Sequence, residues 1–289
     1  MSSGIAQNCP AINAGGKSPP EVREMFARVA RRYDFLNHFL SLGRDFYWRK
    51  VAAREAAGLG PGDLIVDLCT GTGDLAFAFH KAAPEAAVFA LDFTPEMIAL
   101  ALRKAERKKV RASGDMTRFP AVGKSGSCPR MGILDLPAGP AQIENRKSKI
   151  ANVVFSVGDA LALPLADGSA ALAGVAFGLR NVADTGRALK EMLRVVRPGG
   201  KVLVLEFTCP QGRFLGPAYM FYFRHILPLL GRVLAAGAGG AYSYLPRSVE
   251  AFAGPEELAG QLAALGLRDV RAVPLTCGVV HLYVGRKGF

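Results

Sequence analysis

Three short segments of the chain place glycines or acidic residues where an apolar strand gives way to a helix. Residues 66–74 read VDLCTGTGD, with Gly71 and Gly73 between an apolar run and a helical pattern. Glycines at such a turn let backbone N–H groups approach a ligand at the N-terminus of a helix. Glycine pairs are also common in turns that bind nothing, so the other two segments decide the interpretation.

The second and third segments add carboxylates downstream. Asp92 closes the next apolar run, where its side chain could accept hydrogen bonds from both hydroxyls of a ribose, or cap the helix that follows Thr94. Asp159 and Ala160 follow a third apolar run and would offer a carboxylate and a backbone N–H to an adenine edge. Open α/β sheets bind ligands at the carboxyl ends of their strands, where these three segments should meet.

The kind of cofactor follows from what the glycine loop contains and lacks. The loop has neither the G-x-x-x-x-G-K-[ST] pattern of a P-loop nor the third glycine of a dinucleotide fingerprint. Asp67 would repel a pyrophosphate but attract a cationic ligand. S-adenosylmethionine carries a sulfonium and an α-amino group. We therefore predict that it binds at Asp67, Gly71, Thr72 and Gly73, as in a class I methyltransferase.

The elements that must hold these segments alternate between strands and helices. Apolar runs predict strands at 64–68, 87–91, 153–157, 171–176, 201–207, 270–273 and 279–285, and helices at 74–81, 95–108, 186–196 and 255–265. This alternation is typical of a Rossmann-like, doubly wound and mostly parallel α/β sheet, here with seven strands. The last two strands are too close for a helical crossover, so the C-terminal strand should be antiparallel.

Three further regions complete the predicted organisation. Residues 1–20 are small, polar and rich in Pro and Gly, which predicts a disordered N-terminal lead. Residues 22–57 have helical spacing and predict two or three helices before the first strand, and we expect these N-terminal helices to lie over the site. Residues 111–149 are rich in Gly, Pro, Ser, Lys and Arg without periodicity, which indicates a flexible insertion. Residues 21–289, with this insertion, are expected to form a single domain.

Composition limits the class of protein. Half of the 289 residues are hydrophobic, which is enough for a large α/β core, and the net charge of +12 indicates an anionic partner surface, either nucleic acid or membrane. The five cysteines form no close pairs, which favours a reducing compartment over a disulfide framework. Neither a secretory signal nor an apolar run long enough to span a bilayer is present in the sequence. We expect a soluble or peripheral protein.

Three motifs resemble those of the quinone-biosynthesis C-methyltransferases, the group of demethylmenaquinone methyltransferase and 2-methoxy-6-polyprenyl-1,4-benzoquinol methylase. They are RYDFLN at 32–37 with LS at 40–41 and Trp48, FGLRNV at 177–182, and RVVRPGGK at 194–201 with LEFT at 205–208. The resemblance covers roughly 22–110 and 151–286. It implies S-adenosylmethionine-dependent methylation of a ring carbon of a polyprenylated quinol.

This sequence departs from the family pattern at several positions. Asp45 stands where the family usually has His, which exchanges a possible donor for an acceptor. Leu36, Arg197 and Thr208 replace the usual Met, Lys and Ser, and Ala176 replaces a Ser that contacts the cofactor in some members. The 111–149 insertion matches nothing in the family pattern.

By resemblance, Arg180 and Asn181 would face the quinol ring, Arg180 stabilising phenolate charge, and Tyr33 would complete the polar side of the pocket. Ordinary structural roles remain open: an ion pair between Arg180 and Asp184, a helix cap by Asn181, a core position for Tyr33. No His–Asp pair is evident as a base, and the four histidines have no metal-ligand spacing, so no metal is predicted.

The apolar and basic segment 214–236 fits a helix at a membrane interface, a lid over an isoprenoid tail, or a helix buried against the sheet. With the net charge, a polyprenyl substrate favours a cytoplasmic protein peripheral to the inner face of an anionic membrane. An RNA methyltransferase or a non-catalytic subunit is less favoured, and no nucleic-acid partner is expected. Ala176 and the segment 242–248 favour naphthoquinol, the menaquinone precursor, over benzoquinol. Oligomeric state, a homodimer included, stays open.

Overall fold

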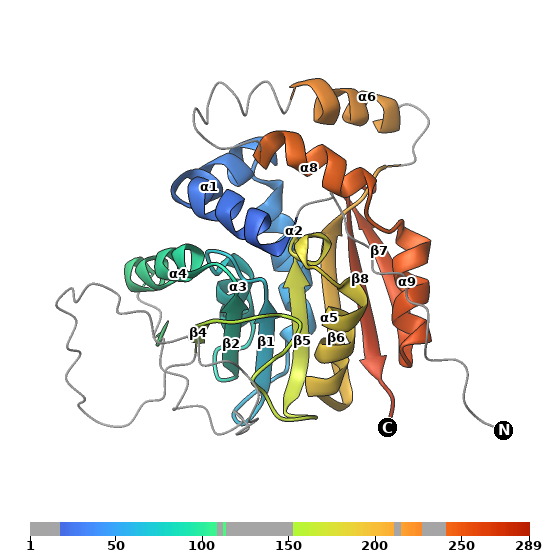
Figure 1. The fold of residues 1–289 in the computed structure, drawn as a ribbon. Helices are drawn as coiled ribbons and strands as arrows, with labels where there is room; N and C mark the ends of the chain where they lie inside the picture. The colour runs from blue at the N-terminus through green and yellow to red at the C-terminus, as the bar shows by residue number, and fades with distance from the viewer. Residues whose placement is uncertain (1–17, 109–111, 114–152, 211–214, 227–240) are drawn as a thin grey trace.

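The computed structural model of the chain describes residues 18–108, 112–113, 153–210, 215–226 and 241–289 (Figure 1). At its centre is a sheet in which neighbouring strands follow the order β3-β4-β2-β1-β5-β6-β8-β7. The elements around this sheet are arranged in the alternating manner that the sequence predicts.

The central strands are parallel and buried. They are β1 (Leu64–Leu68), β2 (Ala87–Asp92), β4 (Val153–Val157), β5 (Ala170–Ala176) and β6 (Val196–Phe207). All five residues of β1 are buried, as expected for a strand covered on both faces. Their carboxyl ends therefore lie at one edge, where the glycine loop and the two downstream carboxylates must come together.

The C-terminal strands confirm the predicted change of direction. β8 (Val280–Lys287) runs antiparallel to β6 and to β7 (Leu267–Leu275). One strand was not predicted: β3 (Ala112–Ser113) pairs in parallel with β4 at the edge of the sheet. A pair of residues is too short to produce an apolar pattern, so this eighth strand left no signal in the sequence.

Helices cover both faces of the sheet, which confirms a doubly wound fold. α5 (Thr185–Val195) and α9 (Pro255–Ala264) pack into one buried apolar cluster. α3 (Asp74–Ala82) and α4 (Pro95–Arg107) pack into a second cluster on the other face, and Trp48 joins them there. The central strands β1, β2, β4 and β5 therefore carry buried side chains on both of their sides.

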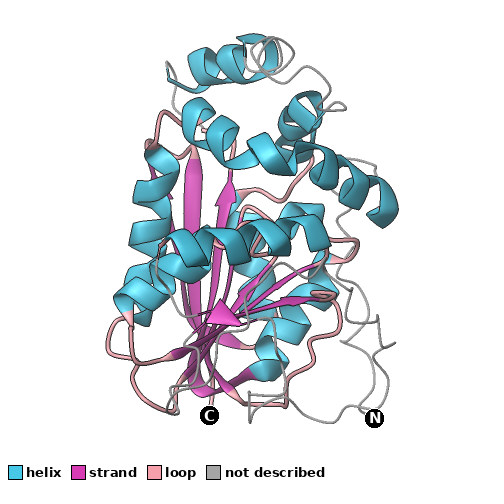
Figure 2. Ribbon diagram, turned by 90° about the vertical axis from the view of Figure 1, so that its left-hand side faces the viewer, coloured by secondary structure: helices cyan, strands magenta, loops and turns pink. Residues whose placement is uncertain are grey.

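Five of the remaining helices gather above the carboxyl edge of the sheet (Figures 1 and 2). They are α1 (Pro19–Leu40), η3 (Leu179–Asn181), α6 (Leu215–Phe221), the π-helical η4 (Tyr222–Ile226) and α8 (Ala241–Glu250). α2 (Arg44–Ala53) follows α1 and, with the short η1 (Arg54–Ala56), packs into the second cluster on the face of the sheet. The carboxylate of Glu21 accepts from the backbone N–H of Ser18 at 2.8 Å, which closes the start of α1. Of the N-terminal helices, α1 thus lies over the site, as predicted.

Two of the predicted segments lie largely outside the described residues. Residues 1–17 of the predicted lead do, and α1 begins at Pro19, inside the last part of that lead. In the predicted insertion 111–149, only residues 112–113 are described, and they form β3. Among the described helices, none combines the length and apolarity that crossing a bilayer requires.

Candidate active site

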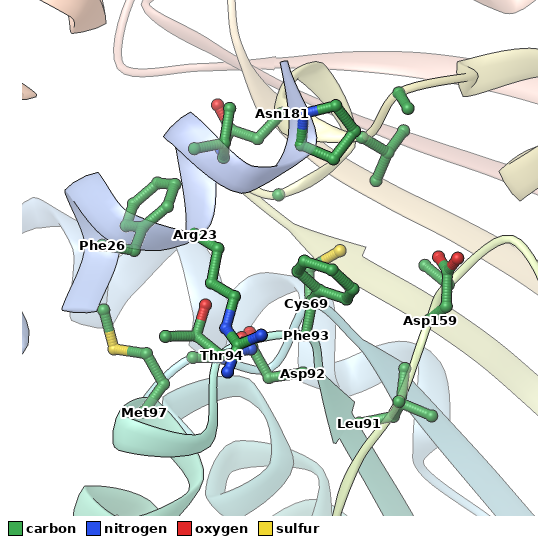
Figure 3. Close-up of a pocket in the computed structure, with 18 of the residues that line it drawn as sticks. Arg23, Phe26, Cys69, Leu91, Asp92, Phe93, Thr94, Met97, Asp159 and Asn181 are labelled. Atoms are coloured by element: carbon green, nitrogen blue, oxygen red, sulfur yellow. The ribbon is translucent and has the colours of Figure 1, made fainter. Parts of the chain in front are cut away.

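Two neighbouring cavities lie at the carboxyl edge of the sheet, and Phe26 and Phe177 line both. The first, of about 150 Å³, lies between α1 and the loops that follow β1, β2, β4 and β5 (Figure 3). Of the residues predicted to bind a cofactor or act on the substrate, its walls contain Gly71, Asp92, Asp159, Ala160, Ala176 and Asn181. The sheet therefore brings together all three segments singled out in the sequence.

Asp92 joins the glycine loop to the start of α4. Its Oδ2 accepts from the backbone N–H of Gly71 at 2.8 Å, and its Oδ1 accepts from the N–H of Thr94 at 2.8 Å. Burial raises the pKa of this carboxyl, while the N–H donors of Thr94 and Gly71 oppose the rise. The predicted helix-capping contact at Thr94 thus exists, and it leaves Asp92 in the wall of the cavity.

The opposite wall comes from the loops after β4 and β5. Figure 3 shows Asp159 across the cavity from Asp92. One carboxylate oxygen of Asp159 accepts from the N–H of Leu161 at 2.9 Å, which fixes the turn, while Ala160 and Ala176 contribute small apolar surfaces. From α1, Arg23 extends toward Asp92 and Thr94. The sequence predicted helices over the site, but not that Arg23 would line this cavity.

Three predicted cofactor residues, Asp67, Thr72 and Gly73, are not among the lining residues of either cavity. Asp67 is 1% exposed and accepts from the hydroxyl of Thr70 at 2.5 Å. Burial raises its pKa to about 7, against the opposing hydrogen bond of Thr70. Its Oδ1 has no hydrogen-bond partner among the described residues. Asp67 therefore lies beneath the glycine loop, and its charge reaches the cavity only through that loop.

Thr72 and Gly73 hold the glycine loop in place. Thr72 donates to a carboxylate oxygen of Asp34 in α1. Gly73 has φ +87°, and a Cβ built on it would lie 2.9 Å from ring atoms of Phe155. Glycine is required at 73 by this conformation and by the close ring, rather than by the approach of a ligand that the sequence suggested.

Two residues other than glycine adopt left-handed backbone conformations at the ends of strands. Cys69, after β1, has φ +51°, and Phe177, after β5, has φ +58°. A Cβ on Gly178 would lie only 2.3 Å from the Cβ of Cys69, so the two loops touch there. Such strain in well-packed loops is typical of functional sites. It holds Phe177 between the two cavities.

The second cavity is larger, about 400 Å³, and mostly aromatic and aliphatic. Its walls come from α1, α2, the ends of β5 and β6, α6, η4 and α8; they include Met25, Phe26, Val29, Trp48, Phe177, Phe207, Tyr219, Tyr222, Phe223 and Tyr244. Polar side chains interrupt this surface, namely Asn37, Ser41, Arg44, Asp45, Arg49, Arg180 and Thr276. A mainly apolar cavity with some polar groups suits a flat, hydrophobic ligand with polar substituents.

Arg180 lines the second cavity and forms a buried ion pair. Its Nη1 lies 2.5 Å from Oε1 of Glu206 and donates to the carbonyl of Phe177 at 2.6 Å. Its Nε is buried and has no hydrogen-bond partner among the described residues. The alternative ion pair with Asp184 is not formed, because Asp184 instead caps α5 by accepting from the N–H of Arg187. Glu206 of β6 thus holds Arg180 at the end of β5, and the sequence did not predict this contact.

Glu206 is a functional residue that sequence reasoning missed. It is fully buried in β6 and is the only charged residue between Val202 and Phe207. A single carboxylate in an apolar strand requires a buried partner. This pattern in the sequence could have identified Glu206 as part of the site.

Asn181 connects the two cavities. It lines the first, and its side-chain oxygen accepts from the hydroxyl of Tyr244 at 3.2 Å, a residue that lines the second. Its Nδ2 lies 3.3 Å from the carbonyl of Phe177. The capping role considered for Asn181 belongs to Asp184, so its amide is placed between the cavities instead.

The structure corrects one expectation about charged residues. His38 and Asp45 form a His–Asp pair, with Nδ1 of His38 at 2.7 Å from Oδ2 of Asp45. Asp45 also accepts from the hydroxyl of Ser41 at 2.8 Å and pairs with Arg49. Burial opposes ionisation of Asp45, but Arg49 and the other donors outweigh it and lower its pKa. A histidine seven residues earlier thus lies in contact with position 45.

Tyr33, the third predicted catalytic residue, lies in α1, but the structure does not describe its side chain. α1 itself is tied to the site, since Asp34 next to it pairs with Lys104 at 2.7 Å. The predicted role of Tyr33 therefore stays a prediction.

The residues of the first cavity fit an adenosyl ligand with a cationic end. Asp92 presents a carboxylate at a strand end, where ribose hydroxyls can donate to it, and Leu91, Phe93 and Ala160 offer apolar surface for a base. The partnerless Oδ1 of Asp67 adds an uncompensated acceptor under the glycine loop. This donor and acceptor set matches S-adenosylmethionine better than a phosphate-bearing cofactor.

Comparison with known proteins identifies the family. A model of the ubiE/COQ5 methyltransferase family matches residues 15–118 and 112–287. The chain is 37% identical to demethylmenaquinone methyltransferase of Deinococcus radiodurans, across 98% of this chain and 99% of that protein. It is 39% identical to ubiquinone/menaquinone biosynthesis C-methyltransferase UbiE of Syntrophotalea carbinolica, across 95% and 97%.

A solved structure supports the fold assignment. Haemonchus contortus phosphoethanolamine N-methyltransferase 2, in complex with S-adenosyl-L-methionine, superposes with a TM-score of 0.57 at 13% identity, covering 93% of this chain and 60% of that one. At this identity the likeness concerns the fold, that of class I methyltransferases. Together with the family match and the three sequence motifs, it leads to one conclusion: the chain belongs to the ubiE/COQ5 methyltransferase family.

Proposed function

We propose that this protein transfers the methyl group of S-adenosylmethionine to a ring carbon of a polyprenylated quinol in menaquinone biosynthesis, converting demethylmenaquinol to menaquinol. One observation carries the proposal: a cavity suited to the cofactor and a larger apolar cavity meet at Phe26 and Phe177. The relative from D. radiodurans is named for the same reaction.

The alternative substrate is the benzoquinol of ubiquinone biosynthesis. The relative from S. carbinolica is named for both pathways, so an enzyme acting on either ring is consistent with the family. Naphthoquinol is favoured because Ala176 and the segment 242–248 resemble the menaquinone-pathway members.

In the first cavity, Asp92 would hold the ribose hydroxyls, and Asp159 with the backbone of Ala160 would hold the adenine. The loop at Gly71 would face the amino-acid end of the cofactor, and the carboxylate of Asp67 beneath it would favour positive charge there. When bound, S-adenosylmethionine would supply an electrophilic methyl group.

Methylation of a ring carbon forms a carbon–carbon bond and breaks the bond between sulfur and the methyl carbon, and the hydrogen of that ring carbon then leaves as a proton, which restores the aromatic ring. A quinol carbon attacks well only when the neighbouring hydroxyl loses its proton and shares the charge with the ring. Arg180, at the end of β5 in the second cavity, would stabilise that developing phenolate. Its ion pair with Glu206 holds the guanidinium in place before the substrate arrives.

Asn181 and Tyr244 would orient the reacting hydroxyl. Their mutual hydrogen bond places an amide and a phenol between the two cavities. Tyr33 would add a third polar group from α1. These residues make the polar end of a cavity that is otherwise apolar, so the quinol ring would enter with its oxygens toward β5.

The substrate also implies a location. A polyprenyl tail resides in a bilayer, so the protein would act at the inner face of the cytoplasmic membrane as a peripheral enzyme. Within the predicted segment 214–236 the structure describes residues 215–226. Tyr219 and Tyr222 of this described part line the second cavity, which favours its role as a cover over the tail.

The direct test supplies the purified protein with S-adenosylmethionine and one acceptor at a time: a short-tailed demethylmenaquinol, a demethylated benzoquinol, or total RNA. We expect methylation of the naphthoquinol at carbon, identified by mass spectrometry, and none of RNA. Methylation of RNA alone, or no cofactor binding at all, would refute the proposal.

A further inference from the structure

Apolar side chains are exposed at the junction of α1 and α2, here called the α1–α2 corner (residues 39–50). Leu42 is 86% exposed, Phe46 56% and Tyr47 46%. Isolated exposed apolar residues are ordinary, but a group of them on neighbouring turns indicates a surface that is covered in use.

The backbone of Leu42 is strained for a leucine. α1 ends in a Schellman arrangement, in which the N–H of Gly43 donates to the carbonyl of His38 at 2.7 Å and that of Leu42 to Phe39 at 3.1 Å. The position that Leu42 occupies, at φ +52°, is normally taken by Gly or Asn. A leucine in this conformation costs conformational energy, and its largely exposed side chain gains little from burial. The side chain is therefore accessible for a contact outside the folded chain.

The α1–α2 corner is also the rim of the second cavity. Leu42 and Arg44 line that cavity while being exposed to solvent, so the cavity reaches the surface at this point. Across the cavity, Tyr219 and Tyr222 line the wall from α6 and η4, and on the same segment Phe221 is 61% exposed. The rim is therefore apolar on both sides.

Basic residues surround this apolar surface. Arg44 and Lys50 are exposed, and neither forms an ion pair with a carboxylate among the described residues. Asp45 is the only acidic residue from 39 to 50, and it is 3% exposed and paired with Arg49. The corner thus presents apolar tips with uncompensated positive charge and no accessible negative charge. This composition matches the surface of an anionic lipid bilayer.

We propose that the α1–α2 corner docks on an anionic membrane, with Leu42, Phe46 and Tyr47 entering the boundary of the acyl chains and Arg44 and Lys50 contacting lipid phosphates. The mouth of the second cavity then faces the bilayer, and an isoprenoid tail can enter without crossing water. This use of the surface rests on the proposed function, whereas binding to lipid can be measured without any substrate.

The first experiment measures sedimentation of the full-length protein with vesicles. One set contains one part phosphatidylglycerol to two parts phosphatidylcholine, and the other contains phosphatidylcholine only. We expect binding to the anionic vesicles that weakens as salt is added, and Lys50→Gln should weaken it further. Equal binding to both sets at all salt concentrations would overturn the electrostatic part of the proposal.

The decisive variant is Leu42→Asn. Asparagine tolerates the left-handed conformation, so the melting temperature should stay unchanged or rise by about 2–4 °C. Vesicle affinity should fall about fivefold, because an apolar side chain no longer inserts. Phe289→Ser is the matched control: this fully exposed side chain ends the chain after β8, at the opposite edge of the sheet (Figure 1). Unchanged vesicle binding by Leu42→Asn, or an equal loss in the control, would overturn the proposal.

A last pair of measurements separates this inference from the catalytic one. Tyr47 does not line either cavity, so Tyr47→Ser should slow methylation of a long-tailed quinol embedded in vesicles but not of a short-tailed quinol in detergent. If the wild-type protein methylates neither the long-tailed nor the short-tailed quinol, the proposed function is refuted, while the result on vesicle binding is unaffected. If Leu42→Asn instead converts a dimer into a monomer without changing vesicle binding, the corner is a contact between two copies, and the membrane proposal fails.

Discussion

At the scale of single residues, Arg180 combines a structural and a chemical role. If it stabilises charge that develops only as the hydroxyl proton leaves, Arg180→Ala should lower kcat more than it raises KM, at about 2.7–4 kcal/mol in the barrier. Arg180→Lys should recover only part of this, since a point charge cannot replace the planar guanidinium. Steady-state kinetics on the quinol, with cofactor affinity measured in parallel, checks both.

Because Glu206 would be left buried without its partner, Arg180→Ala should also destabilise the fold. The double variant Arg180→Ala with Glu206→Gln removes that complication. If the double variant folds, binds cofactor and turns over normally, Arg180 has only a structural role.

Asp92 is the residue on which cofactor affinity should depend most. Asp92→Ala removes the acceptor for two ribose hydroxyls, each worth about 1.5–3 kcal/mol when charge-assisted, so affinity for S-adenosylmethionine should fall at least tenfold. Asp184→Ala is the matched control, because it removes a carboxylate that caps α5 outside both cavities. Calorimetry that gives the same dissociation constant for Asp92→Ala and wild type would exclude the ribose contact.

Asp67 makes stability depend on pH in an unusual direction. In the fold its pKa is raised to about 7, from an ordinary value of 3.8. Between these values the folded chain keeps a proton that the unfolded chain has lost, so this group's contribution falls as pH rises, by about 4 kcal/mol at most. Above pH 7 no further loss occurs. Urea unfolding of the ligand-free protein should show this slope, and Asp67→Asn should remove it; parallel curves for the two proteins would contradict the assignment.

At the scale of elements, a network of charged and polar side chains connects α1 to the cofactor loop. Lys104 of α4 pairs with Asp34 of α1 at 2.7 Å and with Asp74 at the start of α3, and Thr72 donates to the same Asp34. Asp34→Ala should loosen α1 and weaken binding in both cavities, because α1 lines both. Hydrogen exchange should rise in residues 19–40 and not in α5. Unaltered exchange in α1 would show that its apolar contacts suffice.

The elements themselves were largely predictable from sequence, because each apolar run marks one buried strand. The predicted strand at 64–68 is β1, and the helix predicted from 95 to 108 is α4, which ends one residue earlier. The contacts between elements were not predictable. The pair of Arg180 with Glu206 joins residues 26 positions apart through the register of β5 and β6, and no local pattern encodes that register. The same holds for the contact of Arg23 with the first cavity, although helices over the site were predicted.

At the scale of the whole molecule, residues 114–149 should be dispensable. Their composition offers no apolar face to bury, and lengthening a loop costs only about 0.6 kcal/mol for each doubling. Replacement by a short Gly/Ser link that keeps β3 should leave the melting temperature and turnover close to those of the full chain. A large drop in melting temperature would mean that the segment packs against the domain. Leu258→Ala in α9 is a control that should destabilise the core, because this side chain is fully buried.

The wall that the two cavities share has a consequence for inhibition. Phe26 and Phe177 border both spaces, so a single compound could fill both with a very short connection. Joining an adenosyl group to an apolar ring system in this way makes the second binding event intramolecular, with an effective concentration in the millimolar range. Enzymes that bind S-adenosylmethionine but lack the second cavity would bind only the adenosyl half of such a compound. Selectivity would then come from the apolar half, while the cofactor half supplies the anchor.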